Sequence, residues 1–204
     1  VTGDFRKVFV VECYQGVNKQ ELLSYFKELS PTLLIDTENL FKSPEDIERM
    51  TAPYMTEDSL FGYTSHFSYK NFLDTEKVAA CREQITHTNG LIVLCGHGAA
   101  EVYPHLDLLM YIDMARWEIQ QRFRRKEVNG LGVRDKEVAP SLHYKRGYFI
   151  DWIVCDNLKK RLLNKVDYWL DTHISDLPKM IEGETWKAVL KKTASTQFRV
   201  VPLI

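Results

Sequence analysis

The residues with the clearest chemical potential lie in the segment 10–26, VVECYQGVNKQELLSYF. An apolar run reaches Gly16 and Lys19, and a helical pattern follows, which is the outline of a phosphate-binding loop. In the complete Walker A pattern, GxxxxGKS/T, glycines bring backbone N–H groups onto the phosphates, the lysine reaches the outer phosphates and the hydroxyl holds Mg²⁺. The segment therefore predicts phosphate contacts from Gly16 and Lys19.

The loop departs from that pattern at three positions. With Lys19 in the lysine place, Cys13 and Asn18 replace the two glycines, and Gln20 replaces the hydroxyl. Asn18 is a tolerable substitute, since Asn enters left-handed conformations, and we expect it to contact phosphate. Gln20 is a poor Mg²⁺ ligand, which argues against catalytic competence. The alternative is an ordinary strand-to-helix turn.

A carboxylate and a histidine follow two other apolar runs. Asp36 ends LLID, where it would accept a proton from a substrate hydroxyl or organise Mg²⁺; the alternative is a turn or helix cap. His97 stands between Gly96 and Gly98, which permit close backbone approach or positive φ. We expect His97 and Gly98 to contact substrate or phosphate. The alternative is a tight turn with an exposed histidine.

Arginines gather in RWEIQQRFRRKE. Arg122, Arg124 and Arg125 are suited to clamping phosphoryl oxygens, although a charged helix end is often only a solvated face. The segment 128–147 that follows contains glycines and a proline and exceeds most loop lengths, so it predicts a mobile, lid-like excursion. The His and Cys residues show no zinc-ligand spacing, and we predict no metal site.

The elements that must position these residues alternate between strands and helices. Strand patterns occupy 6–12, 30–36, 91–96, 106–113, 148–154 and 167–172. Helical patterns occupy 19–29, 43–50, 74–85, 114–127, 156–165 and 183–194. The uniformly apolar strands predict a parallel sheet covered on both faces, with ligands at the carboxyl ends of the strands.

Composition limits the number of domains and the kinds of partner that we expect. The 204 residues are 45% hydrophobic with a formal net charge of -1, which suits one globular domain and favours neither nucleic acid nor membrane as a partner. The four cysteines form no CxxC pair, so we expect buried free thiols and a cytoplasmic location. Because the chain starts at Val1 and closes on the apolar FRVVPLI, we expect a fragment with more chain after Ile204.

Read in order, these pieces resemble P-loop small-molecule kinases of the uridine-kinase type over roughly residues 6–172. LLIDTENLFK is similar to the second strand of that family, with Asp36 in the place of the catalytic Asp. LIVLCGHGAAEVYPHLDLLMYIDMARWEIQQRFRRKE is similar to its later strands and lid helix, so that Arg122, Arg124 and Arg125 match the lid arginines. Cys95 stands where the family usually has a carboxylate. The resemblance implies ATP and Mg²⁺ as cofactors.

A narrower resemblance is to the kinase-like region ahead of a cupin domain in bacterial proteins labelled class I mannose-6-phosphate isomerases. CYQGV, ARWEIQQRFRRKE, LHYKRGYFIDW and FRVVP carry it. It implies a cupin domain as the covalently following partner. The isomerase chemistry would then belong to a metal site after Ile204.

These observations predict a P-loop-kinase-like, three-layer α/β fold with a mostly parallel sheet of five to six strands. Residues 1–172 would form a degenerate kinase-like core with a lid-like segment at 116–147, and 173–204 a C-terminal helical extension. The expected function is binding of a nucleotide or sugar phosphate as an accessory or regulatory module of carbohydrate metabolism. Two alternatives stay open: an active nucleoside or sugar kinase, and a structural or oligomerisation module.

Overall fold

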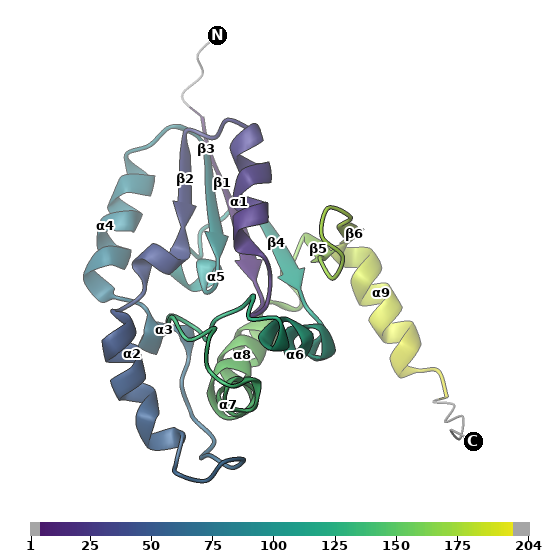
Figure 1. Cartoon of the computed structure of the whole chain (residues 1–204). Coiled ribbons are helices and arrows are strands. Elements are labelled where there is room, and N and C mark those ends of the chain that lie inside the picture. Colours follow the sequence, from purple (N-terminus) through teal and green to yellow (C-terminus); the bar gives the residue numbers. More distant parts are fainter. Residues whose placement is uncertain (1–4, 198–204) are drawn as a thin grey trace.

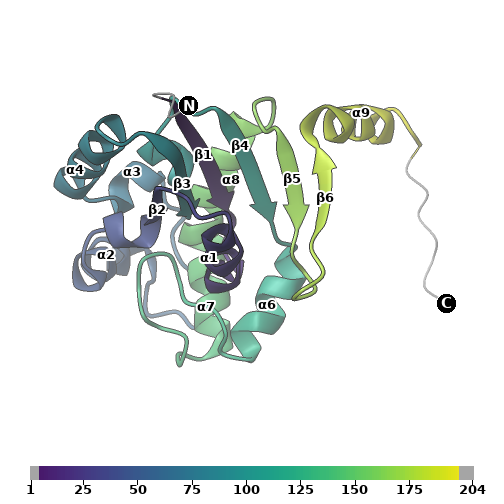
Figure 2. The same cartoon turned by 90° about the horizontal axis from the view of Figure 1, so that it is seen from above.

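A single mixed sheet organises the chain in the computed structural model, which describes residues 5–197 (Figure 1). Its six strands follow the order β2-β3-β1-β4-β5-β6, and every neighbouring pair is parallel except β5 and β6. The strands are β1 (Arg6–Cys13), β2 (Leu33–Asp36), β3 (Gly90–Gly96), β4 (Leu108–Asp113), β5 (Tyr168–Asp171) and β6 (Lys179–Glu182). Figure 2 shows the same order across the sheet from above. The predicted fold class is confirmed.

Helices connect these strands. The α-helices are α1 (Lys19–Glu28), α2 (Pro44–Thr51), α3 (Tyr69–Phe72), α4 (Thr75–Thr86), α5 (Ala99–Val102), α6 (Arg116–Arg124), α7 (Pro140–Arg146), α8 (Trp152–Leu162) and α9 (Gly183–Ala194). Two 3₁₀ turns, η1 (Thr37–Leu40) and η2 (Ala52–Tyr54), and a π-helical turn, η3 (Gly147–Asp151), complete the list. Where the sequence predicted a helix at 43–50, Ser43 caps α2 and Pro44 occupies its first turn.

The direction of the crossovers decides which face each helix covers. Parallel crossover connections are right-handed, so the connection from β1 toward the β2 edge and those running the other way lie on opposite faces. Consequently α1 covers one face, and α4, α5 and α8 cover the other. The loop after β1 and the loop after β3 lead to opposite faces of the sheet. The carboxyl end of β1 is therefore the topological switch point, where ligands bind in such sheets.

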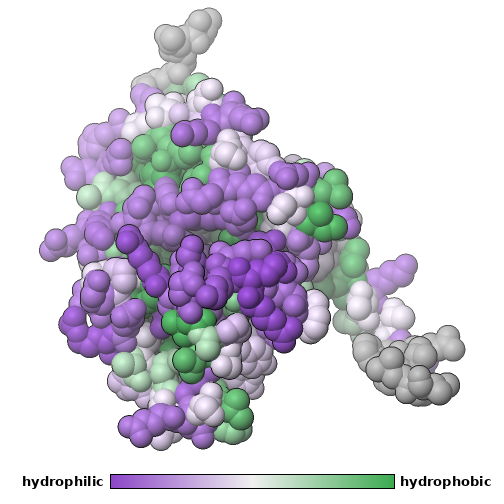
Figure 3. Space-filling model, in the orientation of Figure 1, coloured by the Kyte–Doolittle hydropathy of each residue, from purple (hydrophilic) through white to green (hydrophobic). Residues whose placement is uncertain are grey.

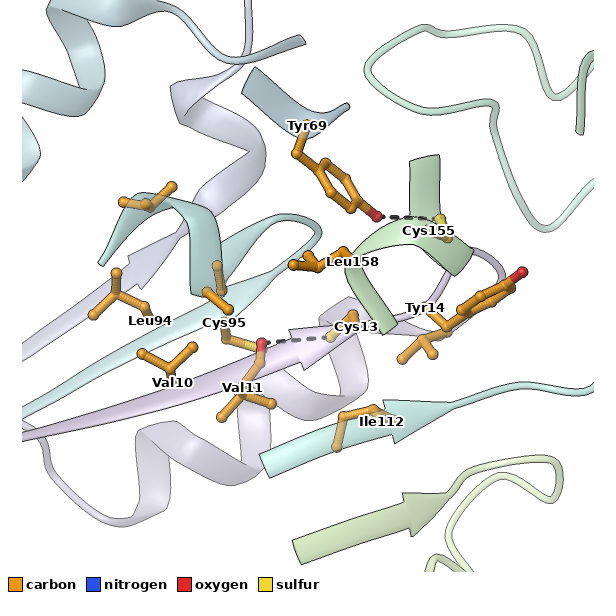
Figure 4. Close-up of a cluster of buried hydrophobic side chains, with 14 of the residues drawn as sticks. Val10, Val11, Cys13, Tyr14, Tyr69, Leu94, Cys95, Ile112, Cys155 and Leu158 are labelled. Atoms are coloured by element: carbon orange, nitrogen blue, oxygen red, sulfur yellow. Dashed lines mark hydrogen bonds between the residues drawn. The ribbon is translucent and has the colours of Figure 1, made fainter. Parts of the chain in front are cut away.

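Apolar strands and free thiols fill the centre. β1 and β3 pair from Arg6–Gly90 to Glu12–Gly96, and Val10, Ile92 and Leu94 are fully buried. All four cysteines are buried and free, as predicted. Figure 4 shows Cys13 and Cys95 side by side on these strands, and a hydrogen bond of 3.1 Å between the Tyr69 hydroxyl and Cys155 Sγ. These contacts hold α3 and α8 on one face.

The predicted strand at 148–154 is wrong. Residues 147–151 form the π-helical turn and α8 follows it. Trp152, Cys155, Leu158 and Leu162 are buried at helical spacing. A short apolar run has the same composition in a buried helix as in a buried strand, so the pattern alone did not separate the two.

The region expected as a helical extension, 173–204, also contains a strand. Lys179–Glu182 pairs antiparallel with β5, from Tyr168–Glu182 to Asp171–Lys179, so the sheet continues past residue 172. The predicted helix at 183–194 is α9. Residues 198–204 lie outside the described residues. Between residues 5 and 197, no helix is long and apolar enough to cross a membrane.

Glu12 ties β1 to the turn after β3. Its side chain is 1% exposed, and its two oxygens accept hydrogen bonds from the backbone N–H groups of Gly98 at 2.8 Å and Ala100 at 2.9 Å. Burial raises the pKa of Glu12 to about 8, and the two hydrogen bonds oppose that rise. Gly98 has the positive φ predicted for the turn, +71°, and a Cβ there would lie 2.9 Å from the Tyr69 ring.

Glu12 should make folding depend on pH. Between its ordinary pKa of 4.5 and its folded pKa of about 8, the folded state holds a proton that the unfolded state has lost. The free energy of unfolding should therefore fall by a few kcal/mol as pH rises through this window, since one pKa unit corresponds to about 1.4 kcal/mol. Urea unfolding from mildly acidic to mildly basic pH measures this fall, and Glu12→Gln should flatten it. The exposed control Glu45→Gln should behave as wild type; equal pH profiles for Glu12→Gln and wild type would contradict the assignment.

Candidate functional site

A cleft of about 960 Å³ opens at the carboxyl ends of the central strands. It lies between the loop after β1, the region around η1 and the segment 125–136. Figure 3 shows hydrophilic residues gathered over α1 and α6 on this side. Of the predicted site residues, the cleft is lined by Gly16, Asn18, Lys19, His97, Arg122 and Arg125. Asp36 reaches it through Lys19, whereas Gly98 and Arg124 do not line it.

The loop after β1 does not offer a row of free amides. Tyr14 N–H donates to the Ile112 carbonyl at 2.9 Å, Val17 to Tyr14 at 3.3 Å and Lys19 to Val17 at 2.9 Å. The N–H of Gln15 donates to the Cys155 sulfur. Most amides from residue 14 to residue 19 are thus already used within the protein, so they do not form the anion nest of a complete phosphate-binding loop.

Gly16 and Asn18 shape this loop in different ways. Gly16 has φ +95°, and a Cβ there would lie 2.8 Å from Ile119 Cγ1, so the position requires glycine. Asn18 has φ −74°, which corrects the expected left-handed conformation, while its phosphate contact stays a prediction. It is instead the N-cap of α1, and its Oδ1 accepts from the Glu21 N–H at 3.4 Å.

Lys19 is held by two carboxylates. Its Nζ lies 2.8 Å from Asp36 Oδ1 and 2.5 Å from Glu38 Oε2, and its side chain is 8% exposed. Burial alone would lower the pKa of Lys19, but the hydrogen bonds to Asp36 and Glu38 outweigh it and raise the pKa. The lysine therefore stays charged. Asp36 also caps η1 by accepting from the Glu38 N–H at 3.0 Å, which is the cap alternative; its catalytic role stays a prediction.

His97 is buried, which corrects the alternative of an exposed histidine. Its Nδ1 lies 2.9 Å from the Cys13 carbonyl, which assigns the proton of the neutral ring to Nδ1. Nε2 then points to the cleft, 3.8 Å from Glu38 Oε1. Burial raises the pKa of Glu38, but His97 and Lys19 outweigh that effect and lower it. Sequence reasoning missed Glu38, although it follows Asp36 by two residues at the end of β2.

The three predicted lid arginines have different surroundings. Arg122 is 6% exposed and donates to the Gly16 carbonyl at 2.8 Å, the Thr172 carbonyl at 3.2 Å and Glu118 at 3.1 Å. It joins segments and has little capacity left for a ligand. Arg125 pairs with Glu118 and Glu127, both at 2.7 Å, at the rim of the cleft. Arg124 is exposed, and among the described residues its side chain bonds only Gln121, at 3.4 Å.

The predicted lid-like segment 116–147 makes buried contacts with the core. Leu131 and Val133 are 1% and 4% exposed. Asp151, fully buried, accepts from the Leu131 N–H at 3.2 Å and from Gln15 Nε2 at 3.1 Å. Arg146 donates to that carboxylate at 3.2 Å. Buried apolar and charged contacts thus pack this segment against the core in the structure, and its mobility stays a prediction.

Unpaired cations distinguish the cleft. Eight Lys and Arg side chains line it against three Glu side chains. Among residues 5–197, the side chains of Lys42, Arg134 and Lys136 have no hydrogen-bonded or ion-paired partner. Sequence reasoning missed all three, since Lys42 stands on the loop after η1, Arg134 and Lys136 stand on the loop after α6, and the three form no motif. Their convergence makes the cleft electropositive and suited to an anion.

The described part of the chain contains no group of three or more His, Cys, Asp or Glu side chains that could hold a metal ion. Asp36 and Glu38 are nonetheless two neighbouring carboxylates at the cleft. Mg²⁺ is commonly held by one or two carboxylates together with substrate phosphates. Both carboxylates already pair with the Lys19 ammonium, so an ion that arrives with a nucleotide would have to displace Lys19 from them.

The chain matches solved structures but no curated protein sequence. A shikimate kinase from Bacteroides thetaiotaomicron is similar in structure, with TM-score 0.46, 12% identity and coverage of 93% of this chain and 99% of that one. A shikimate kinase from Acinetobacter baumannii in complex with shikimate gives 0.40, 15%, 96% and 96%. A gluconokinase from Sinorhizobium meliloti gives 0.38, 14%, 78% and 99%.

A family profile matches nearly the whole chain. The match runs over residues 2–195 and so includes the sheet with β6, the cleft and α9. The chain belongs to the family described as Domain of unknown function (DUF8485).

Proposed function

We propose that the chain is a binding domain for a phosphorylated small molecule, a nucleotide or a sugar phosphate. The observation that carries this proposal is the charge of the cleft: eight cationic side chains against three carboxylates, with Lys42, Arg134 and Lys136 unpaired. Guanidinium and ammonium groups without protein partners are the donors that phosphate oxygens select. Because most amides of the loop after β1 are already hydrogen-bonded within the protein, side chains would hold the phosphate in this chain.

Lys19, a predicted phosphate ligand, would bind phosphate only by giving up its present contacts. Its ammonium group is paired with the carboxylates of Asp36 and Glu38. A phosphate that approaches Lys19 competes with both carboxylates for the same ammonium group. Binding through Lys19 therefore weakens an ion pair as it forms another, which limits the net affinity from this residue.

A second candidate is an active small-molecule kinase. It is favoured by the contact of 2.8 Å between Lys19 and Asp36 at the switch point of the sheet. Asp36 would accept the proton of a substrate hydroxyl, and Asp36 with Glu38 would hold Mg²⁺, which neutralises phosphate charge when bound. Against this candidate stands Gln20, which supplies no hydroxyl to the ion.

The wider role remains a hypothesis. An accessory or regulatory module of carbohydrate metabolism agrees with a sugar phosphate as the ligand. The relation to mannose-6-phosphate isomerases and a following cupin domain has no support in the similarities described above, and a structural module without a small ligand is the third reading. That reading predicts no binding at the cleft, so one titration separates it from our proposal.

Calorimetric titration with ATP, UTP and sugar phosphates tests the binding proposal. Wild type should bind at least one of them, and Lys42→Ala with Arg134→Ala should weaken that binding about tenfold or more, since charge-assisted hydrogen bonds contribute roughly 1.5–3 kcal/mol each. The paired control Lys27→Ala with Lys191→Ala removes the same charge from α1 and α9, outside the cleft. No phosphate ligand bound at millimolar concentration, or equal loss in both pairs, would sink the proposal.

Removing one competitor of Lys19 should strengthen phosphate binding. Glu38→Gln keeps the size of the side chain but removes one of the two negative charges that hold Lys19. We expect metal-free inorganic phosphate or sugar phosphate to bind several-fold more tightly to this variant than to wild type. Glu45→Gln, on α2, is the matched control. Unchanged or weaker binding in Glu38→Gln would show that Lys19 is not a phosphate ligand.

A coupled assay of ADP release tests the kinase candidate. With nucleosides and sugars as acceptors, wild type should turn over and Asp36→Asn should lose about 10²- to 10⁴-fold of the rate, the typical contribution of a general base. Circular dichroism verifies that the variant is folded. Equal rates, or turnover in neither protein, would rule this candidate out and leave the binding proposal untouched.

A further inference from the structure

A second cavity lies on the other side of the sheet edge. It has a volume of about 520 Å³, within the range of roughly 300–1,000 Å³ typical of small-molecule sites. Its walls come from the carboxyl ends of β4 and β5, from β6, and from α8 and α9. It shares only His173 with the cleft. Neither the predicted site residues nor the proposed function uses it.

Aromatic rings form one wall. Trp169 of β5 and Trp186 of α9 have ring centroids 5.2 Å apart, and Tyr111 packs behind Trp169 at 4.7 Å. Trp169 is 4% exposed, so its ring is a fixed surface, and Trp186 is half-buried. In the described part of the chain, the buried Nε1 atoms of Trp169 and Trp186 have no hydrogen-bond acceptor. These two N–H groups are covered by protein, so what the wall presents to the cavity is its apolar face.

Charged groups around the cavity cancel in pairs. Lys159 Nζ lies 2.6 Å from Asp113 Oδ2, and Arg116 contacts Asp156. The cavity is lined by three Lys and Arg side chains, with Lys179 the third, and by three Asp side chains. The contrast with the cleft is chemical: an anion gains nothing from this balanced set, whereas a neutral group that both donates and accepts hydrogen bonds does.

From these walls we infer that the cavity binds an uncharged polyhydroxylated ring, such as a neutral sugar or cyclic polyol. The C–H face of the ring lies against the half-buried indole of Trp186, which the buried Trp169 supports from behind. Each hydroxyl can donate to an Asp carboxylate and accept from a Lys or Arg group, which matches the alternating pairs around the rim. A flat base would stack as well, but its few polar atoms would leave most of these pairs unused.

Lys159 contacts both the aromatic wall and the charged rim of the cavity. Its Nζ lies 5.6 Å from the Tyr14 ring centroid and 5.8 Å from that of Trp169 while it pairs with Asp113. A cation held over ring faces keeps its position, because the rings and the carboxylate attract it together. The polar rim is therefore positioned before a ligand arrives, which reduces the ordering cost of binding.

Saturation-transfer NMR of the full chain with glucose, mannose, inositol and adenosine tests this site. At least one neutral polyol should bind, and Trp186→Ala should weaken that binding tenfold or more. The exposed Trp117→Ala, away from the cavity, and the cleft variant Lys42→Ala should both bind it as wild type does. Because Trp186→Ala removes packing from α9, Asp156→Asn serves as a second variant of unchanged shape, with a several-fold loss expected.

Three results would overturn the assignment. They are no transfer to any polyol at millimolar concentration, unchanged polyol binding in both Trp186→Ala and Asp156→Asn, and binding of adenosine in preference to every polyol. Circular dichroism identifies a variant that has unfolded. Since the cleft variants are measured alongside, loss of phosphate binding and loss of polyol binding are read independently.

Discussion

The buried guanidinium of Arg122 is the interaction on which the arrangement of the site depends. It binds the carbonyl of Gly16 after β1, the carbonyl of Thr172 after β5 and the carboxylate of Glu118 on its own helix. One side chain thereby fixes three segments that are far apart in sequence. An arginine suits this task because its planar group presents several donors in fixed directions. The same contacts remove Arg122 from the supply of ligand-binding cations.

This arrangement changes how an anion would be recognised. In a glycine-rich loop the backbone supplies the donors, and the side chains assist. In this chain most backbone donors after β1 are used by Ile112, Cys155 and the loop itself. The electropositive character comes instead from side chains on loops that follow β2 and α6. Such side chains are longer and more mobile than amides, so shape selection by the cleft is weaker and charge selection dominates.

Much of the fold was predictable from the sequence because its signals are local. β3 is a continuous apolar run, β1 contains the apolar run 8–11, and α2 begins at a Ser-Pro pair. The carboxyl-end location of Lys19, Asp36 and His97 followed from the parallel sheet. The π-helical turn and α8 were not predictable, since an apolar run fits strand and helix equally. Nor were Lys42, Arg134 and Lys136, whose convergence depends on tertiary contacts alone.

The sheet also bears on how the chain behaves at high concentration. Its two outer strands, β2 and β6, have only four residues each, whereas the central β1 has eight. Unpaired N–H and C=O groups at an edge are templates for strands of other molecules, and short or charged edges limit such pairing. β6 carries Lys179 at its start and Glu182 at its end. The long apolar strands are thus enclosed between short borders, which protects them from edge-to-edge aggregation.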